Sequence, residues 1–293
     1  MSKARSIRCL QVELYMTNFK AAVVQMRSSR DIAENVRVAS ELIREAASAG
    51  ADFIATPENT PLMEMERPRV DAATYPDDGA NATIAAFQSL AAEIGRWLLL
   101  GSLAVKTEEG RLANRSLLFA PDGAIAARYD KIHMFDVTVS EAERYQESRN
   151  FRPGREAVLA RLPWGVLGLT VCYDLRFPYL YRALAKAGAS FLSVPSAFTK
   201  TTGQAHWHVL LRARAIETGA YVFAPAQGGR HENGRETYGH SLIVDPWGRV
   251  VAEAGEEPAI AMAKIDPAEV EKARARIPAL THDAELPAPR LAK

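Results

Sequence analysis

The sequence predicts an α/β fold with mixed sheets, on the basis of two observations. One local pattern occurs four times: an amphipathic helical stretch ends at a glycine and a short apolar strand follows. Two other stretches look like β-hairpins, with extended runs on both sides of a turn. Alternating helices and strands are typical of layered α/β folds. The hairpins add antiparallel strands, which count against a purely parallel barrel or a dinucleotide-binding domain.

The four helix–glycine–strand units occupy both halves of the chain. In the first, a predicted helix over 31–49 precedes Gly50 and a strand over 52–56. Glycine is common just after a helix because it adopts the left-handed conformation without a Cβ clash. The other units have the same order, with glycines at Gly95, Gly188 and Gly219 and strands over 97–100, 190–194 and 221–224.

The two predicted hairpins have turn residues between extended runs. The first turn is Pro121-Asp122-Gly123 and the second is Asp245-Pro246-Trp247-Gly248, residue types that favour tight turns. The flanking strands are expected over 115–120 and 124–129 for the first hairpin, and over 240–244 and 249–254 for the second.

No Pro/Ser-rich linker or shift in composition divides the chain, so we expect a single domain over 17–293. From about residue 278 the prolines predict an extended tail that could reach a partner subunit. Residues 1–16 lack the continuous apolar stretch and cleavage site of a signal peptide. They are expected to be an N-terminal extension that could be disordered, and translation could begin at Met16.

Composition favours small-molecule chemistry in a reducing compartment. The net charge is +1, from 36 basic and 35 acidic residues, which gives no electrostatic footprint for nucleic acid or an anionic membrane. No apolar run reaches the roughly 18 residues that a membrane span needs. The two cysteines, Cys9 and Cys172, do not form a disulfide framework, so a cytoplasmic location is expected, with Cys172 as a free thiol.

Three reactive residue types follow predicted strands, where ligands gather in open α/β sheets. Glu58 follows the strand over 52–56, Lys131 closes the first hairpin, and Cys172 follows an apolar run over 166–171. Taken alone, such a cysteine is usually an inert core residue, and the Glu and Lys are usually solvated. Together they supply what a thiol hydrolase needs: a nucleophile, a base to activate it, and a cation for the oxyanion.

Three motifs resemble the catalytic motifs of the nitrilase (carbon–nitrogen hydrolase) superfamily in order and spacing: Pro57-Glu58, Tyr129-Asp130-Lys131-Ile132-His133 and Cys172-Tyr173-Asp174-Leu175-Arg176-Phe177-Pro178. The resemblance extends from about Phe19 to Pro278. It implies a four-layer α-β-β-α sandwich whose subunits pair through helices, as a homodimer or higher homo-oligomer. It also implies a small-molecule amide substrate and no cofactor or metal.

By this resemblance each motif residue has a role in a two-step acyl transfer. Glu58 would be the general base, Cys172 would form the thioester, and Lys131 would stabilise the tetrahedral intermediates together with the Tyr173 N–H. A second glutamate, 16 residues after the lysine, is Glu147 and would orient the site. Its alternative is a surface loop acid.

Several downstream segments resemble the branch that hydrolyses deaminated glutathione, with ω-amidases close to it: Pro195-Ser196-Ala197-Phe198, Gly203-Gln204-Ala205-His206-Trp207, Gly228-Gly229-Arg230-His231 and Tyr238-Gly239-His240-Ser241. Both branches release ammonia from a primary amide on a small carboxylated molecule. N-carbamoyl compounds remain an alternative. The stretch over 137–144 is acidic and lacks the glycines of family members, so it could select a different amide.

The resemblance implies five substrate-binding residues: Tyr173, Arg176, Ser196, Ala197 and His206. A carboxylated substrate needs a cation, for which Arg176 and then Arg230 are the candidates. Arg176 could equally form a structural ion pair with Asp174 or Glu217.

Other functions find less support in the sequence. His206 and His208 would share one face of a strand, but no acidic or cysteine ligands lie near them in sequence, so no metal site is expected. His133 is expected near the mouth of the site. Nucleotide-binding and serine-hydrolase motifs are absent. A non-enzymatic scaffold with a redox-sensing Cys172 remains an alternative, but it gives Glu58 and Lys131 no role.

Overall fold

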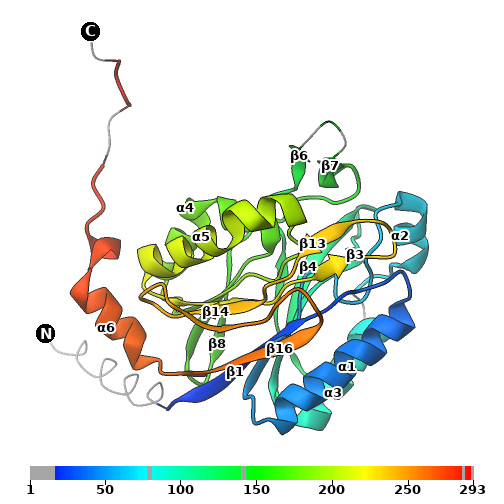
Figure 1. Ribbon diagram of the computed structural model, residues 1–293, viewed down its shortest axis with the longest axis horizontal. Helices are drawn as coiled ribbons and strands as arrows, with labels where there is room; N and C mark the ends of the chain where they lie inside the picture. Colours follow the sequence, from blue (N-terminus) through cyan, green and yellow to red (C-terminus); the bar gives the residue numbers. More distant parts are fainter. Residues whose placement is uncertain (1–16, 78–80, 140, 142, 286–287, 292–293) are drawn as a thin grey trace, which may run out of the picture.

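The computed structural model describes residues 17–77, 81–139, 141, 143–285 and 288–291 (Figure 1). The expected N-terminal extension over 1–16 therefore lies outside the described residues. Two six-stranded sheets form the centre of the molecule. None of the described helices is long and apolar enough to cross a membrane.

The first sheet has the strand order β16-β1-β2-β3-β4-β5. Its central strands β1, β2 and β3 are parallel, whereas β16, β4 and β5 join by antiparallel pairing. The strands are β1 (Phe19–Gln25), β2 (Phe53–Ala55), β3 (Trp97–Lys106), β4 (Leu112–Phe119), β5 (Ile125–Asp130) and β16 (Ala259–Ile265).

The second sheet has the strand order β15-β14-β11-β10-β9-β8. Strands β9, β10 and β11 are parallel, and the other three join antiparallel. The strands are β8 (Val158–Leu162), β9 (Gly165–Leu169), β10 (Phe191–Ser193), β11 (Tyr221–Ala224), β14 (Leu242–Val244) and β15 (Val250–Glu253). Two small hairpins pair β6 (Asp136–Thr138) with β7 (Arg144–Gln146), and β12 (Gly228–Arg230) with β13 (Glu236–Tyr238).

Helices cover the outer face of each sheet, giving the expected α-β-β-α layers (Figure 1). α1 (Ile32–Ser48) and α3 (Ala82–Ile94) lie on the first sheet, and α4 (Pro178–Lys186) and α5 (Lys200–Thr218) lie on the second. Ile43 of α1 and Phe87 of α3 are buried in one apolar core with the outer face of the first sheet. Between the sheets, the ring centroids of Phe53 on β2 and Phe223 on β11 lie 5.2 Å apart. The fold prediction is confirmed.

The four predicted helix–glycine–strand units and both hairpins are present. α1 begins at Asp31, whose carboxylate accepts from the Glu34 N–H, a normal N-terminal cap. α5 ends at Gly219, which adopts φ 56°, and β11 follows. β3 is longer than predicted because its second half, up to Lys106, pairs with β4.

Other elements differ from the predictions or extend them. His206 and His208 lie on α5, not on a strand, because the helix begins at Lys200 behind the Thr199 cap. After α6 (Ala268–Arg276) and a 3-10 turn over Ala279–Thr281, the described chain runs away from the layers as far as residue 291 (Figure 1). A short helix, α2 (Arg67–Ala73), follows β2. The single-domain boundary and the contact of the tail with a partner remain predictions.

Candidate active site

The three residues predicted as the catalytic set line one cavity of about 130 Å³. Glu58 follows β2 and Lys131 follows β5, so both come from the first sheet. Cys172 opens a 3-10 turn (Cys172–Arg176) after β9 of the second sheet. Glu58, Lys131 and Cys172 are 3%, 2% and 7% exposed. The site therefore spans the interface between the sheets.

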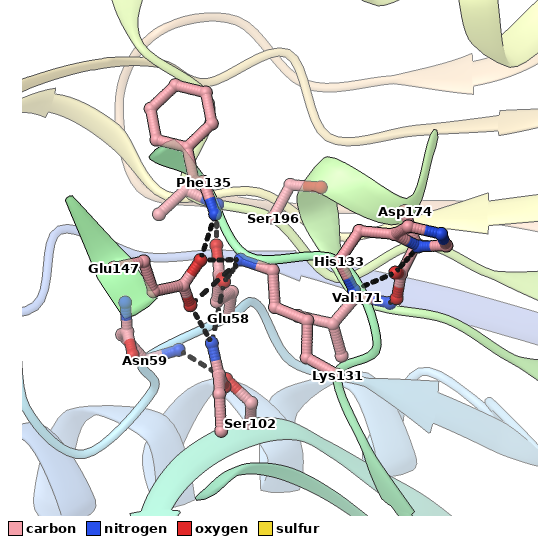
Figure 2. A network of polar contacts seen from close by, with 12 residues as sticks. Glu58, Asn59, Ser102, Lys131, His133, Phe135, Glu147, Val171, Asp174 and Ser196 are labelled. Atoms are coloured by element: carbon pink, nitrogen blue, oxygen red, sulfur yellow. Dashed lines mark hydrogen bonds and ion pairs between the residues drawn. The ribbon is translucent and has the colours of Figure 1, made fainter. Parts of the chain in front are cut away.

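Lys131 is the centre of a buried ion network (Figure 2). Its Nζ lies 3.0 Å from Glu58 Oε1, and 3.0 and 2.8 Å from the two oxygens of Glu147. Burial lowers the pKa of Lys131, but the carboxylates of Glu147 and Glu58 outweigh it and hold that pKa above its ordinary value. Lys131 is therefore a fixed cation beside the thiol.

Glu58 is held as an anion from several sides. Its Oε1 also accepts from Asn114 Nδ2 at 2.9 Å, and its Oε2 accepts from the Ala197 N–H at 2.9 Å. Burial acts to raise the pKa of Glu58. The positive charges of Lys131 and then Arg235 lower it by more than burial raises it, so the pKa lies below its ordinary value. The carboxylate is thus ionised and available as a proton acceptor.

Cys172 adopts a left-handed backbone with φ 48°, which is strained for a residue other than glycine. Its N–H donates to the Pro195 carbonyl at 2.9 Å, and its side chain lines the same cavity as Glu58. Burial and the Glu58 carboxylate raise the pKa of the thiol, while Lys131 acts in the opposite direction. The raised pKa favours a neutral resting thiol.

Buried Asp174 fixes the turn that presents Cys172. Its carboxylate accepts from the Val171 N–H at 2.9 Å and from the Tyr129 hydroxyl at 2.7 Å. His133 also binds it, through its N–H at 3.1 Å and through Nδ1 at 2.6 Å. The motif around Lys131 is therefore tied to the motif around Cys172, and His133 does not line the cavity.

Glu147 is part of this network and not a surface loop acid. It begins the 3-10 turn Glu147–Arg149, and its side chain is 14% exposed. Besides Lys131, its carboxylate accepts from Asn114 Nδ2 at 3.1 Å and from the Phe135 N–H at 2.7 Å. These contacts fix the carboxylate that, together with Glu58, holds Lys131.

Asn114 was missed at the sequence level. It lies on β4, and its Nδ2 donates to both Glu58 and Glu147, so one amide spaces the two carboxylates. Its buried Oδ1 has no hydrogen-bond partner among the described residues. An asparagine within a strand was the available signal, because asparagine is depleted in strands.

Arg235 was also missed, and it is the arginine that lines the cavity. It precedes β13, its Nη2 donates to the Ala197 carbonyl at 2.5 Å, and its guanidinium lies 5.3 Å from the Tyr145 ring centroid. Its buried Nε has no hydrogen-bond partner within the described part of the chain. A turn arginine gives no distinctive sequence signal.

The predicted substrate-binding residues divide into two groups. Tyr173 and Ala197 line the cavity, whereas Arg176, Ser196 and His206 do not. Arg176 lies 3.3 Å from His206 Nδ1, and the Ser196 hydroxyl donates to the Val194 carbonyl. The alternative ion pairs of Arg176 are not seen either, since Asp174 binds His133 and Glu217 binds Arg214. Arg230 is exposed and does not line the cavity either.

The β6–β7 hairpin, which contains the acidic stretch over 137–144, borders the site. Phe135 and Tyr145 at its two ends line the cavity, and the Tyr145 hydroxyl donates to Glu143 at 2.9 Å. Residues 140 and 142 of the stretch lie outside the described residues. The hairpin therefore forms part of the cavity wall.

Comparisons with known proteins agree with this geometry. Residues 20–275 match the carbon-nitrogen hydrolase family. The deaminated glutathione amidase of Synechocystis is 42% identical over 271 residues, which cover 91% of this chain and 98% of that protein. The human deaminated glutathione amidase is 40% identical over 266 residues, covering 89% and 81%. The crystal structure of the C. elegans NitFhit protein has a TM-score of 0.85 at 37% identity, covering 92% of this chain and 66% of that one. The chain belongs to the carbon–nitrogen hydrolase family.

Proposed function

We propose that this protein is a cysteine-dependent amidase that hydrolyses an amide of a small carboxylated molecule of the deaminated glutathione type. The amide bonds of the glutathione backbone are secondary, so the nitrogen of such a substrate leaves as an amine, and the expected ammonia applies only to a primary amide. The observation that carries the proposal is the single buried cavity shared by a thiol, an anionic carboxylate and a fixed ammonium group. The substrate class is supported by the amidases of Synechocystis and human, which are 42% and 40% identical to this chain.

In the first half-reaction, Glu58 takes the thiol proton as Cys172 attacks the amide carbon. The carbonyl oxygen becomes an oxyanion that Lys131 Nζ and the Tyr173 N–H stabilise. Because the resting thiol is neutral and Glu58 is ionised, proton transfer is unfavourable until the new negative charge forms beside Lys131. The intermediate then collapses, the carbon–nitrogen bond breaks, and the nitrogen takes the proton from Glu58 and leaves as an amine, or as ammonia from a primary amide.

In the second half-reaction, Glu58 takes a proton from water while the water oxygen attacks the thioester carbon. Lys131 again faces the oxyanion, the carbon–sulfur bond breaks, and the thiolate recovers its proton as the carboxylic acid departs. Glu147 and Asn114 hold Lys131 and Glu58 in place through both steps without exchanging protons. The scheme uses no metal and no cofactor.

We also propose Arg235 as the partner of the substrate carboxylate, in place of the expected Arg176 and Arg230. A guanidinium can bind a carboxylate through two parallel N–H groups, and Arg235 retains a buried Nε without a partner among the described residues. Its position beside Ala197, whose N–H binds Glu58, puts the cation next to the catalytic set.

The assembly remains a proposal, as does a cytoplasmic location. We propose a homodimer that pairs through α4 and α5, because Tyr179, Val209 and Ile216 are 63%, 67% and 54% exposed on these helices. Light scattering after gel filtration would report the mass, and a monomer at micromolar concentration would contradict the proposal.

Release of the nitrogen product from a panel of substrates tests the function, measured by chromatography as the amine fragment for deaminated glutathione and as ammonia for the other compounds. The panel holds deaminated glutathione, 2-oxoglutaramate, an N-carbamoyl amino acid and a simple nitrile. We expect turnover of deaminated glutathione, lowered by about three orders of magnitude or more in Cys172→Ala and unchanged in Cys9→Ser. Near-normal turnover by Cys172→Ala would refute the mechanism. Turnover of another compound alone would keep the mechanism and replace the substrate.

A redox-sensing scaffold is the competing function. It needs an accessible thiol, because oxidation follows thiolate character and exposure. Here Cys172 is buried with a raised pKa, and both features slow oxidation. Silence across the whole panel would favour this alternative.

A further inference from the structure

Two imidazoles and a carboxylate converge outside the active-site cavity. His208 lies on α5, His240 lies between β13 and β14, and Glu253 ends β15. Their potential ligand atoms all lie within 4.8 Å of one another. His208 Nε2 and His240 Nδ1 are 2.9 and 2.8 Å from the same atom, Glu253 Oε1.

The surrounding structure fixes at least one of these side chains firmly. His240 adopts the left-handed region with φ 53°, which is strained for a residue other than glycine. Its N–H donates to the Gly255 carbonyl at 2.9 Å, and its carbonyl accepts from Trp207 Nε1 at 2.9 Å. Its ring stacks on Tyr238 with a centroid distance of 4.4 Å. The imidazole is thereby directed at Glu253.

His208 and Glu253 stand on regular elements. His208 follows Trp207, which is fully buried and holds this part of α5 against the second sheet. Glu253 lies on β15, the edge strand of that sheet. Ligands on rigid elements need little rearrangement to bind an ion.

We propose that these three residues, the His–His–Glu cluster, bind a divalent ion of the zinc type. Two imidazole nitrogens and a carboxylate oxygen, with water in the fourth position, are a common zinc ligand set. Tetrahedral ligands about 2.0–2.1 Å from zinc lie about 3.3 Å apart, so the contacts here open by about 0.5 Å on binding. The side chains of His208, His240 and Glu253 are 33%, 23% and 36% exposed, which leaves access for the ion and its water.

The chemistry favours zinc over harder ions. Magnesium prefers six oxygen ligands, and this cluster offers one carboxylate. The ion would connect α5 to two segments that lie further along the chain. Glu253 is 45 residues from His208, and His240 is 33 residues from Trp207, the residue before His208. Binding therefore stabilises the folded chain and leaves the amide chemistry alone, so the inference does not depend on the proposed function.

Zinc binding is best measured on full-length chain that lacks both thiols. Cys9→Ser/Cys172→Ala protein, free of its purification tag and stripped with a chelator, is titrated with zinc chloride by calorimetry and, separately, melted with and without zinc. We expect one zinc per chain and, at a 100-fold excess over the dissociation constant, a rise of roughly 5 °C in the unfolding midpoint. Magnesium chloride should give neither signal.

Three variants in that background assign the ligands. His208→Ala and the isosteric Glu253→Gln should lose the saturable heat and the thermal shift. His206→Ala, which removes an exposed imidazole two residues away on α5, should keep both. Equal binding by all three variants would place zinc elsewhere and overturn the proposal. No saturable binding in the thiol-free background would also overturn it and leave a plain hydrogen-bonded cluster.

Discussion

Two ion networks in this molecule each join one basic side chain to two glutamates, but one network is buried and the other is exposed. In the active site, Lys131 binds Glu58 and Glu147, and its side chain is 2% exposed. On α1, Arg37 binds Glu34 and Glu41, and its side chain is 55% exposed. Water screens the helix network, whereas the buried charges depend on one another because nothing else solvates them. We therefore expect the helix network to contribute little to stability, and the buried network to be required for folding and, by the proposed mechanism, for catalysis.

Removing each central cation gives the largest expected contrast. Lys131→Met leaves two buried carboxylates uncompensated, so we expect a loss of about 3–5 kcal/mol in the free energy of unfolding. We also expect turnover to fall by two to three orders of magnitude, as for loss of an oxyanion donor. Arg37→Met, the matched control, should leave both unchanged. Urea unfolding and turnover of the amide substrate measure the two effects, and equal losses in both variants would refute the comparison.

Replacing Arg235 should have an effect between those of the Lys131 and Arg37 replacements, and it tests the proposed contact with the substrate carboxylate. In Arg235→Met we expect kcat/KM for the carboxylated amide to fall about 10- to 100-fold, because a charge-assisted hydrogen bond is lost. The methyl ester of the same amide has no carboxylate and serves as the control substrate. It should be turned over equally by wild type and variant. An equal loss on both substrates would assign Arg235 to positioning Ala197.

A variant of Asn114 tests whether the spacing of the buried charges matters when their number is unchanged. Asn114→Ala keeps every charge but removes the amide that spaces Glu58 from Glu147. We expect kcat to fall about tenfold with KM nearly constant, because bonds to charged groups contribute about 1.5–3 kcal/mol each and Lys131 still holds both carboxylates. Steady-state kinetics decides this. A rise in KM with normal kcat would show that Asn114 contacts the substrate.

Added salt should give the smallest effect, a change in the pKa of the exposed Glu34 without a change in that of the buried Glu58. The pKa of both Glu58 and Glu34 lies below the ordinary 4.5, Glu58 against the effect of burial and Glu34 through its hydrogen bond with Arg37. In carboxyl titrations by NMR, 1 M salt should return Glu34 toward 4.5 and leave Glu58 lowered. A Glu58 pKa that rises with salt as much as that of Glu34 would show that water reaches the cavity.

The acid limits of activity and stability follow from the same shift. The contribution of Glu58 to stability is fully present above its unfolded pKa and disappears as pH falls through its lower folded pKa. The acid limb of kcat/KM should accordingly lie below pH 4.5. A limb well above that value would assign it to another group.

Much of the fold could be predicted because its signals are local. Gly219 ends α5 and a strand follows, as the apolar pattern and the left-handed preference of glycine indicate. Gly203 shows the limit of such reasoning. A Cβ at this position within α5 would lie 2.3 Å from Tyr238 Cβ. Tertiary packing therefore requires the glycine, and no local pattern in the sequence indicates that contact.

The site divides in the same way. Glu58, Lys131 and Cys172 each follow a strand, so strand ends and three motifs were enough to find them. Asn114 binds Glu58, 56 residues away, and Glu147, 33 residues away. Arg235 reaches the site because the turn before β13 folds over the cavity. Both depend on contacts between segments far apart in sequence, which single-sequence patterns do not encode.

The split origin of the catalytic set has a mechanical consequence. The proposed base and cation belong to one sheet and the proposed nucleophile to the other, so no single sheet contains the whole set. A relative slide of the sheets would move the thiol with respect to Glu58 and Lys131 while every strand stayed hydrogen-bonded to its neighbours. We therefore expect the rate of hydrolysis to respond to small changes in the relative position of the two sheets that leave the helix and strand content unchanged.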